Sequence, residues 1–123
     1  MPERDGAVVS DELLMNAFAA LAQQTRLAVF RLLIRQGPEG LPAGEIARRL
    51  GVPQNTLSTH LSVLARGSLV RARRRGRNII YAADLEGVRQ LILFLTRDCC
   101  HGRPEKCEAL VETLLPVCGS VEK

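Results

Sequence analysis

Residues 43–66 read AGEIARRLGVPQNTLSTHLSVLAR, and most of the architecture can be predicted by starting from this stretch. Apolar residues recur at helical spacing on both sides of the turn Gly51-Val52-Pro53. Gly51 can adopt a positive φ and end the first helix, and a second helix is expected from about Gln54 to Arg66. Two short helices joined by a tight turn that contains glycine are typical of a helix-turn-helix, with the second helix as its recognition helix.

The segments on the N-terminal side of this pair are also predicted to be helical. Apolar residues at helical spacing predict a helix that is capped by Ser10 and continues to about residue 21, and a second helix over residues 24–35. Residues 37–40, Gly-Pro-Glu-Gly, end the second helix. Residues 1–9 are expected to form a flexible tail.

On the C-terminal side, residues 69–73 and 78–81 are expected to form two strands around Arg74-Arg75-Gly76-Arg77. This hairpin would be a wing with an arginine-rich tip. Asp84 should cap a last long helix, which Gly102 and Pro104 would break. The predicted fold class is therefore mainly α with a small β-hairpin, a winged helix-turn-helix, for which the family resemblance given below implies a dimer.

The predicted organisation is one DNA-binding and dimerisation domain over residues 10–101, followed by a C-terminal segment over residues 102–123 with a short helix from about residue 104 to 115. A chain of 123 residues is long enough for one domain. No segment is long and apolar enough to span a bilayer, and the N-terminus lacks the charge and apolar pattern of a secretory signal, so we expect a cytoplasmic protein without a membrane partner.

Charge is distributed unevenly along the chain. The net charge is only +4, but the stretch between Glu45 and Asp84 contains eight arginines and no acidic residue. Such a block is the electrostatic footprint expected for contact with a phosphate backbone. The eight are Arg48, Arg49, Arg66, Arg71, Arg73, Arg74, Arg75 and Arg77.

The predicted recognition helix carries short or flexible polar side chains that can bond base edges or phosphates. His60 allows two interpretations, a phosphate contact or a hydrogen bond within the domain. The wing arginines are better suited to phosphates or to a narrow minor groove. The candidate DNA-binding residues are Gln54, Asn55, Ser58, Thr59 and His60 on the helix, and Arg73, Arg74, Arg75 and Arg77 on the wing.

Taken together, these motifs resemble the ArsR family of metal-responsive winged-helix repressors. The resemblance covers about residues 10–97 and implies a homodimer paired through its first and last helices. It also implies binding to double-stranded operator DNA, an imperfect inverted repeat, and release on metal binding. The matching segments are Phe18-Ala19-Ala20-Leu21-Ala22, Thr25-Arg26-Leu27, Glu45-Ile46-Ala47, Leu50-Gly51-Val52, Ser58-Thr59-His60-Leu61, Leu64, Gly67-Ser68-Leu69-Val70, Arg74-Arg75-Gly76-Arg77 and Tyr81.

The chain departs from this family in the place of its cysteines. Many members carry a thiol on the first helix of the DNA-reading pair, whereas residues 41–47 here contain none. The run from Cys99 to Cys107 is instead similar to the C-terminal arsenite site of a subgroup. As(III) favours three sulfur ligands, and soft thiolates suit it. We therefore predict that Cys99, Cys100 and Cys107 bind As(III) as inducer.

Other interpretations of the thiols remain open. Zinc could take the same three cysteines with His101 as a fourth ligand, and Sb(III), lead or cadmium also suits thiolates. Methylated trivalent arsenic would need only two thiols, and a disulfide from Cys107 to Cys99 or Cys100 would make a redox switch. Cys118 is interpreted as a bystander.

Two further protein classes compete with a regulator. The thiols could belong to an enzyme of arsenic chemistry, but no Cys-x-x-Cys pair is present and no general base other than His101 is apparent. Alternatively, the chain could be a constitutive DNA-binding protein whose thiols are incidental. The sequence favours a regulator that is not an enzyme.

Overall fold

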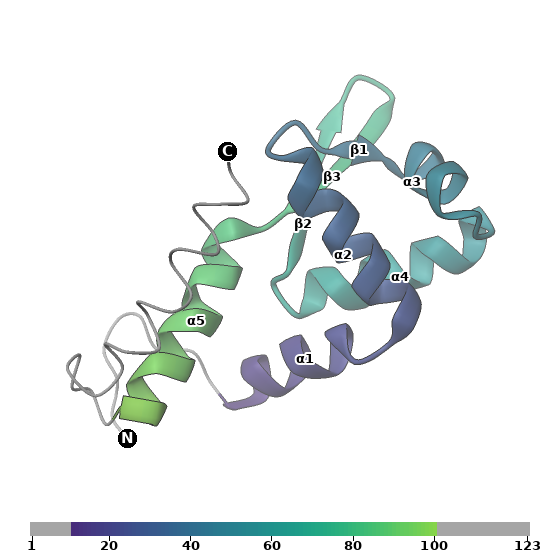
Figure 1. The fold of residues 1–123 in the computed structure, drawn as a ribbon. Coiled ribbons are helices and arrows are strands. Elements are labelled where there is room, and N and C mark those ends of the chain that lie inside the picture. The colour runs from purple at the N-terminus through teal and green to yellow at the C-terminus, as the bar shows by residue number, and fades with distance from the viewer. Residues whose placement is uncertain (1–10, 101–123) are drawn as a thin grey trace. The chain divides into compact units, whose positions relative to one another are not determined.

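The computed structural model describes the backbone of residues 11–100 and the side chains of residues 11–96. The predicted architecture, a mainly helical winged helix-turn-helix, is confirmed (Figure 1). In chain order the elements are α1 (Asp11–Leu21), α2 (Gln24–Gln36), β1 (Leu41–Pro42), α3 (Ala43–Leu50), α4 (Gln54–Arg66), β2 (Val70–Arg75), β3 (Asn78–Ala83) and α5 (Leu85–Cys100).

The helix-turn-helix is formed by α3 and α4, as the sequence predicts. Gly51 ends α3 in the left-handed conformation, with φ 67° and ψ 35°. The amide of Val52 then donates to the carbonyl of Ala47 across 3.1 Å, which satisfies one of the carbonyls left unpaired at the helix end. The turn therefore closes without strain, and α4 starts after Pro53.

The core gathers around α2, which contacts α1, α3, α4 and β3. Val29 and Leu33 of α2 are fully buried. Burying a side chain of this size stabilises the fold by about 1.5–3 kcal/mol. The largest fully buried side chains are Leu33, Ile46, Leu57, Leu61, Leu64, Leu69 and Val29. Because three of these belong to α4, one side of the recognition helix is fixed by packing.

The sheet is larger than the predicted hairpin. It has three antiparallel strands in the order β1-β3-β2, with Leu41 opposite Tyr81 and Pro42 opposite Ile80. Gly40, with φ +71°, lets the chain enter β1, because a Cβ at this position would lie 2.5 Å from the Tyr81 carbonyl oxygen. β1 was not predicted, because its two residues, one of them proline, are too few to show an alternation of polar and apolar side chains.

The bounds of the wing also differ from the prediction. β2 continues to Arg75 and β3 begins at Asn78, so only Gly76 and Arg77 form the turn. Arg74 and Arg75 therefore lie on a strand, where we expected the tip of the loop. A strand fixes alternate side chains on opposite faces, which separates arginines that the sequence places side by side.

The chain between α4 and β2 packs against the first turn of α5. The amide of Asp84 donates to the carbonyl of Leu69 across 2.8 Å, and the Asp84 carboxylate caps the helix by accepting from the amide of Gly87 at 3.1 Å. A Cβ on Gly87 would lie 1.7 Å from the carbonyl oxygen of Ser68. Only glycine therefore fits at this position, and the predicted cap at Asp84 is confirmed.

The described residues divide into two compact units, and the division falls inside α5 after Gln90. The predicted tail over residues 1–9 and the predicted segment over residues 102–123, with its short helix, lie outside the described residues. Among residues 11–100, no single helix is long and apolar enough to cross a membrane. Only α1 and α2 taken together reach the required length and composition, and they meet at 97°.

Candidate nucleic-acid interface

The polar side of α4 is open to solvent over its first two turns. Gln54, Asn55, Ser58 and Thr59 are exposed, whereas Leu57 between them is fully buried. The Asn55 side-chain oxygen accepts from the amide of Thr56 at 2.9 Å, and the Ser58 hydroxyl donates to the Gln54 carbonyl at 3.2 Å. These two bonds hold Asn55 and Ser58 close to the helix, while the Asn55 amide group can still donate and the Ser58 oxygen can still accept.

His60 is less exposed than its neighbours and takes part in a hydrogen bond within the domain. Its Nδ1 lies 3.4 Å from Nη1 of Arg26 on α2. The structure thus shows the bond within the domain that the sequence left open for His60, and this bond engages only Nδ1 of the ring.

Arg26 also lies in this interface region, although no role for it was predicted from the sequence. Its Nε donates to the Ala20 carbonyl at 2.7 Å, and its Nη2 lies 3.5 Å from the Ala19 carbonyl. A cation at the C-terminal end of a helix is favourable, because the last carbonyls are unpaired and carry partial negative charge. Arg26 belongs to the segment Thr25-Arg26-Leu27 of the ArsR-like signature, which was the available signal.

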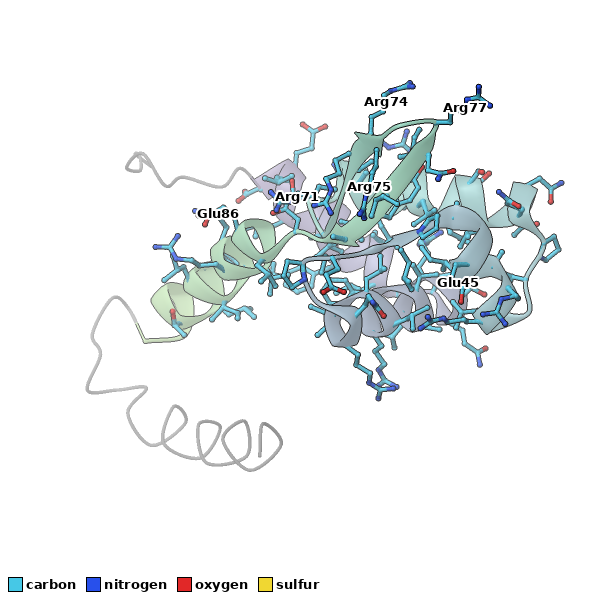
Figure 2. All side chains as sticks on the ribbon, turned by 90° about the horizontal axis from the view of Figure 1, so that it is seen from above. Glu45, Arg71, Arg74, Arg75, Arg77 and Glu86 are labelled. Atoms are coloured by element: carbon cyan, nitrogen blue, oxygen red, sulfur yellow. The ribbon has the colours of Figure 1, made fainter. Side chains whose placement is uncertain are left out.

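The wing arginines are exposed and lie on two faces of β2. The register pairs Arg73 with Ile80, Arg74 with Ile79 and Arg75 with Asn78. Because side chains alternate along a strand, Arg74 lies on the opposite face from Arg73 and Arg75. Figure 2 shows Arg74 and Arg77 at the end of the hairpin, pointing away from the helices. The four predicted wing residues therefore present charge in more than one direction.

Most of the wing charge is unneutralised within the described part of the chain. Arg73 donates to the Glu39 carbonyl at 3.3 Å, which fixes its side chain without neutralising it. Among residues 11–96, Arg74, Arg75 and Arg77 have neither an ion pair nor a hydrogen bond. Guanidinium groups in this state are available for phosphate oxygens.

The two arginines of α3 are in a different state. Arg48 bonds Glu45 through two nitrogens, and Arg49 Nε donates to the same carboxylate at 2.8 Å. The hydrogen bonds from Arg48 and then Arg49 lower the pKa of Glu45 to about 2. Glu45, which stands just outside the arginine block of the sequence, thus partly neutralises two of its eight members. Figure 2 shows Glu45 well away from Arg74 and Arg77.

The predicted metal ligands fall at or beyond the end of the described chain. Cys99 and Cys100 are the last two residues of α5, but their side chains lie outside the described residues, as do Cys107, His101 and Cys118. Within residues 11–96, no group of three or more His, Cys, Asp or Glu side chains could hold a metal ion. The thiol site therefore stays a prediction.

Comparisons with known proteins agree with this geometry. A helix-turn-helix domain family matches residues 21–73. The chain is 34% identical over 92 residues to the HTH-type transcriptional regulator KmtR of Mycobacterium tuberculosis, covering 75% of this chain and 68% of that one.

Two solved structures extend the likeness to the fold. An ArsR-like transcriptional regulator from Rhodococcus sp. RHA1 superposes with a TM-score of 0.66 at 26% identity, covering 85% of this chain and 93% of that one. A homodimeric winged helix-turn-helix DNA-binding domain from Mycobacterium bovis, a possible ArsR-family regulator, gives a TM-score of 0.57 at 28% identity, covering 73% of this chain and 88% of that one.

Proposed function

Because this chain belongs to the ArsR family of helix-turn-helix transcriptional regulators, we propose that it is an arsenite-responsive repressor that acts as a homodimer. It is a DNA-binding regulator and not an enzyme. The observation that carries the proposal is the combination of an exposed polar face on α4 and an unneutralised arginine wing with a pair of thiols at the end of α5. In the reducing cytoplasm, these cysteines would be free to bind a soft ion.

DNA would be read by α4 and held by the wing. Gln54 and Asn55 at the start of α4 can form hydrogen bonds with base edges in the major groove, while Arg74 and Arg77 reach phosphates beside it. A twofold dimer places two recognition helices on the duplex, so the operator would be an imperfect inverted repeat with half-sites about one helical turn apart.

Exposed apolar side chains support assembly through α1 and α5. On α1, Met15 is 67% exposed and Phe18 is 43% exposed. Leu85, Ile92 and Leu95 of α5 are also exposed. Leu14 is not available for such an interface, because it is buried in the core of its own protomer. Large apolar side chains left in water mark a surface for association on each helix taken by itself.

The inducer would be As(III), held by Cys99, Cys100 and Cys107. A trigonal thiolate site balances the charge of the ion and needs no histidine. The competing inducers are Sb(III), methylated trivalent arsenic bound by two thiols, and zinc bound also by His101. A disulfide switch is a further alternative. All of them would act at the same end of α5.

A backbone contact offers a route from α5 to the recognition helix. The first turn of α5 lies against the segment that follows α4, because Gly87 has no side chain to separate it from Ser68. A shift of α5 would push directly on the end of α4. A hundredfold loss of operator affinity requires about 2.7 kcal/mol of coupling free energy.

The decisive experiment is an arsenite titration of the reduced protein bound to DNA. The duplex would be one that the wild-type protein selects from a random-sequence pool. Cys99→Ser, Cys100→Ser and Cys107→Ser should each fold and bind this duplex, yet lose release by arsenite. Cys118→Ser is the matched control and should respond like the wild type.

The outcomes separate the competing inducers. Loss of response at Cys99 and Cys100 alone would indicate a two-thiol site suited to methylated arsenic. His101→Ala should leave the arsenite response intact but weaken a zinc response. A normal response of Cys107→Ser together with a lost response of Cys118→Ser would refute the proposed trigonal site.

A further inference from the structure

Arg26 lies where α1, α2 and α4 meet, and it bonds both of the other helices. Its Nε and Nη2 face the last carbonyls of α1, and its Nη1 faces Nδ1 of His60 on α4. The backbone of Arg26 is fixed as well, because its amide donates to the Gln23 side-chain oxygen at 2.8 Å. The guanidinium thus approaches His60 from a defined direction.

The direction of this bond determines the protonation of the ring. A guanidinium group has five N–H donors and no acceptor, so Nδ1 of His60 must supply the lone pair. A protonated imidazole has no lone pair on either nitrogen, and therefore the bonded ring is neutral. Its one proton is on Nε2, which becomes a donor that no other described residue uses.

We infer that Arg26 is a positioning residue that holds His60 as the neutral Nε2–H tautomer, and that His60 donates this proton to the phosphate backbone of DNA. His60 is partly exposed and lies about 100° around α4 from the exposed Thr59, so it stands at the edge of the polar face, where a side chain can meet the phosphate backbone beside the groove. This inference rests on the DNA-binding function and deepens it. The contact differs in kind from the wing contacts, because a neutral donor releases no counterion.

The first measurement is the tautomer of His60 in the free protein. Nitrogen-15 NMR of the two imidazole nitrogens separates the Nε2–H form, the Nδ1–H form and the charged ring. The chain has two histidines, and His60→Gln assigns the signals. We expect the Nε2–H form at pH 7.5, and a mixture of forms in Arg26→Met, which has no donor. A charged ring or an Nδ1–H ring in the wild type would overturn the inference.

The second measurement is DNA affinity without any metal, in buffer with a chelator, on a duplex that the wild type selects from a random pool. His60→Gln places an amide N–H near the position of Nε2 and should bind within about threefold of the wild type. His60→Met lacks a donor and should bind about tenfold more weakly, as expected for one hydrogen bond to a charged group. The salt dependence of both variants should equal that of the wild type.

The other possible affinities of the His60 variants also test whether His60 donates a hydrogen bond to DNA. Equal losses in the Gln and Met variants would mean that shape or charge matters, and no loss in either would mean that His60 does not bind DNA. A double-mutant cycle should show that Arg26→Met costs less affinity in the His60→Gln background than in the wild type. Circular dichroism identifies the variants that fold, and only these are compared. If Arg26→Met does not fold, the tautomer of His60 in the wild type still tests the inference.

This experiment can fail separately from the proposed arsenite response. It uses no metal, so an insensitive sensor would leave its result unchanged. If the wild type selected no DNA at all, the proposed function would fail, while the tautomer measurement would still test the role of Arg26.

Discussion

The arginines of α3 and those of the wing belong to one stretch of sequence but differ in their electrostatic state. Arg48 and Arg49 share the carboxylate of Glu45, whereas Arg74, Arg75 and Arg77 have no carboxylate partner among residues 11–96. The cause is the spacing of each element. A helix brings residues three and four apart together, so one acid just before the block reaches two arginines. On a strand, neighbouring residues point apart.

The difference teaches that formal charge is a poor measure of the charge available to DNA. Glu45 partly neutralises α3, although it stands outside the acid-free block. The wing keeps its full charge on exposed side chains. Electrostatic attraction to the duplex should therefore come mainly from the wing.

Removing the wing charge should have the largest effect. The triple change Arg74→Ala, Arg75→Ala and Arg77→Ala should weaken binding to all duplexes on the order of a hundredfold, because three charged contacts are lost. The slope of log K against log salt should flatten by about 2.7, from three phosphates at about 0.9 each. Affinity measured between 50 and 200 mM salt checks both values.

A control for this change removes charge from two positions on α2 that are not part of the proposed interface. Arg31→Ala with Arg35→Ala alters two exposed residues of α2 and should change the salt slope far less per charge. An unchanged salt slope in the triple variant would show that the wing does not contact phosphates.

Changes on the polar face of α4 should have the next largest effect. They should lower the discrimination between DNA sequences and leave the salt dependence unchanged. Gln54→Ala or Ser58→Ala should lower discrimination between the selected duplex and random DNA by about 1–3 kcal/mol for each good base contact. The salt slope should stay the same, because no phosphate contact is lost. Ser62→Ala, an exposed serine later on α4, is the matched control. Equal losses on selected and random DNA would contradict base reading.

How far the sequence could predict these features depends on whether they are local. The helices predicted within residues 11–100, the turn at Gly51 and the cap at Asp84 follow from spacing and from single residues, and these are confirmed. Strand β1 and the bonds of Arg26 are contacts between distant segments. Neither the two residues of β1 nor one arginine in a helix signals its partner, so the sequence could not predict them. The ligand role of the cysteines remains a prediction.

Removing the carboxylate of Glu45 should have a smaller effect on DNA binding than the changes above. Glu45→Gln would free Arg48 and Arg49 from a carboxylate and leave the shape of the side chain nearly unchanged. Non-specific DNA affinity should rise by about two- to fivefold, with a slightly steeper salt slope, because two more cations become available to phosphates. Glu39→Gln is the matched control, since the same charge is removed from an exposed loop residue. If both variants gained equally, net charge alone would explain the effect and the pairing in α3 would be irrelevant.

The smallest expected effect concerns pH and tests the pairing in the folded protein. Hydrogen bonds from Arg48 and Arg49 lower the pKa of Glu45 from 4.5 to about 2. A lowered carboxyl pKa stabilises the fold fully above the unfolded value, and this contribution is lost as the pH falls from about 4.5 towards 2. The difference in melting temperature between the wild type and Glu45→Gln should therefore be constant from pH 8 to about pH 5 and shrink below it. Because the groups are exposed, the difference should be small and should decrease with salt. A difference that changed between pH 6 and 8 would come from another group, and the contrast between α3 and the wing would then need a different physical cause.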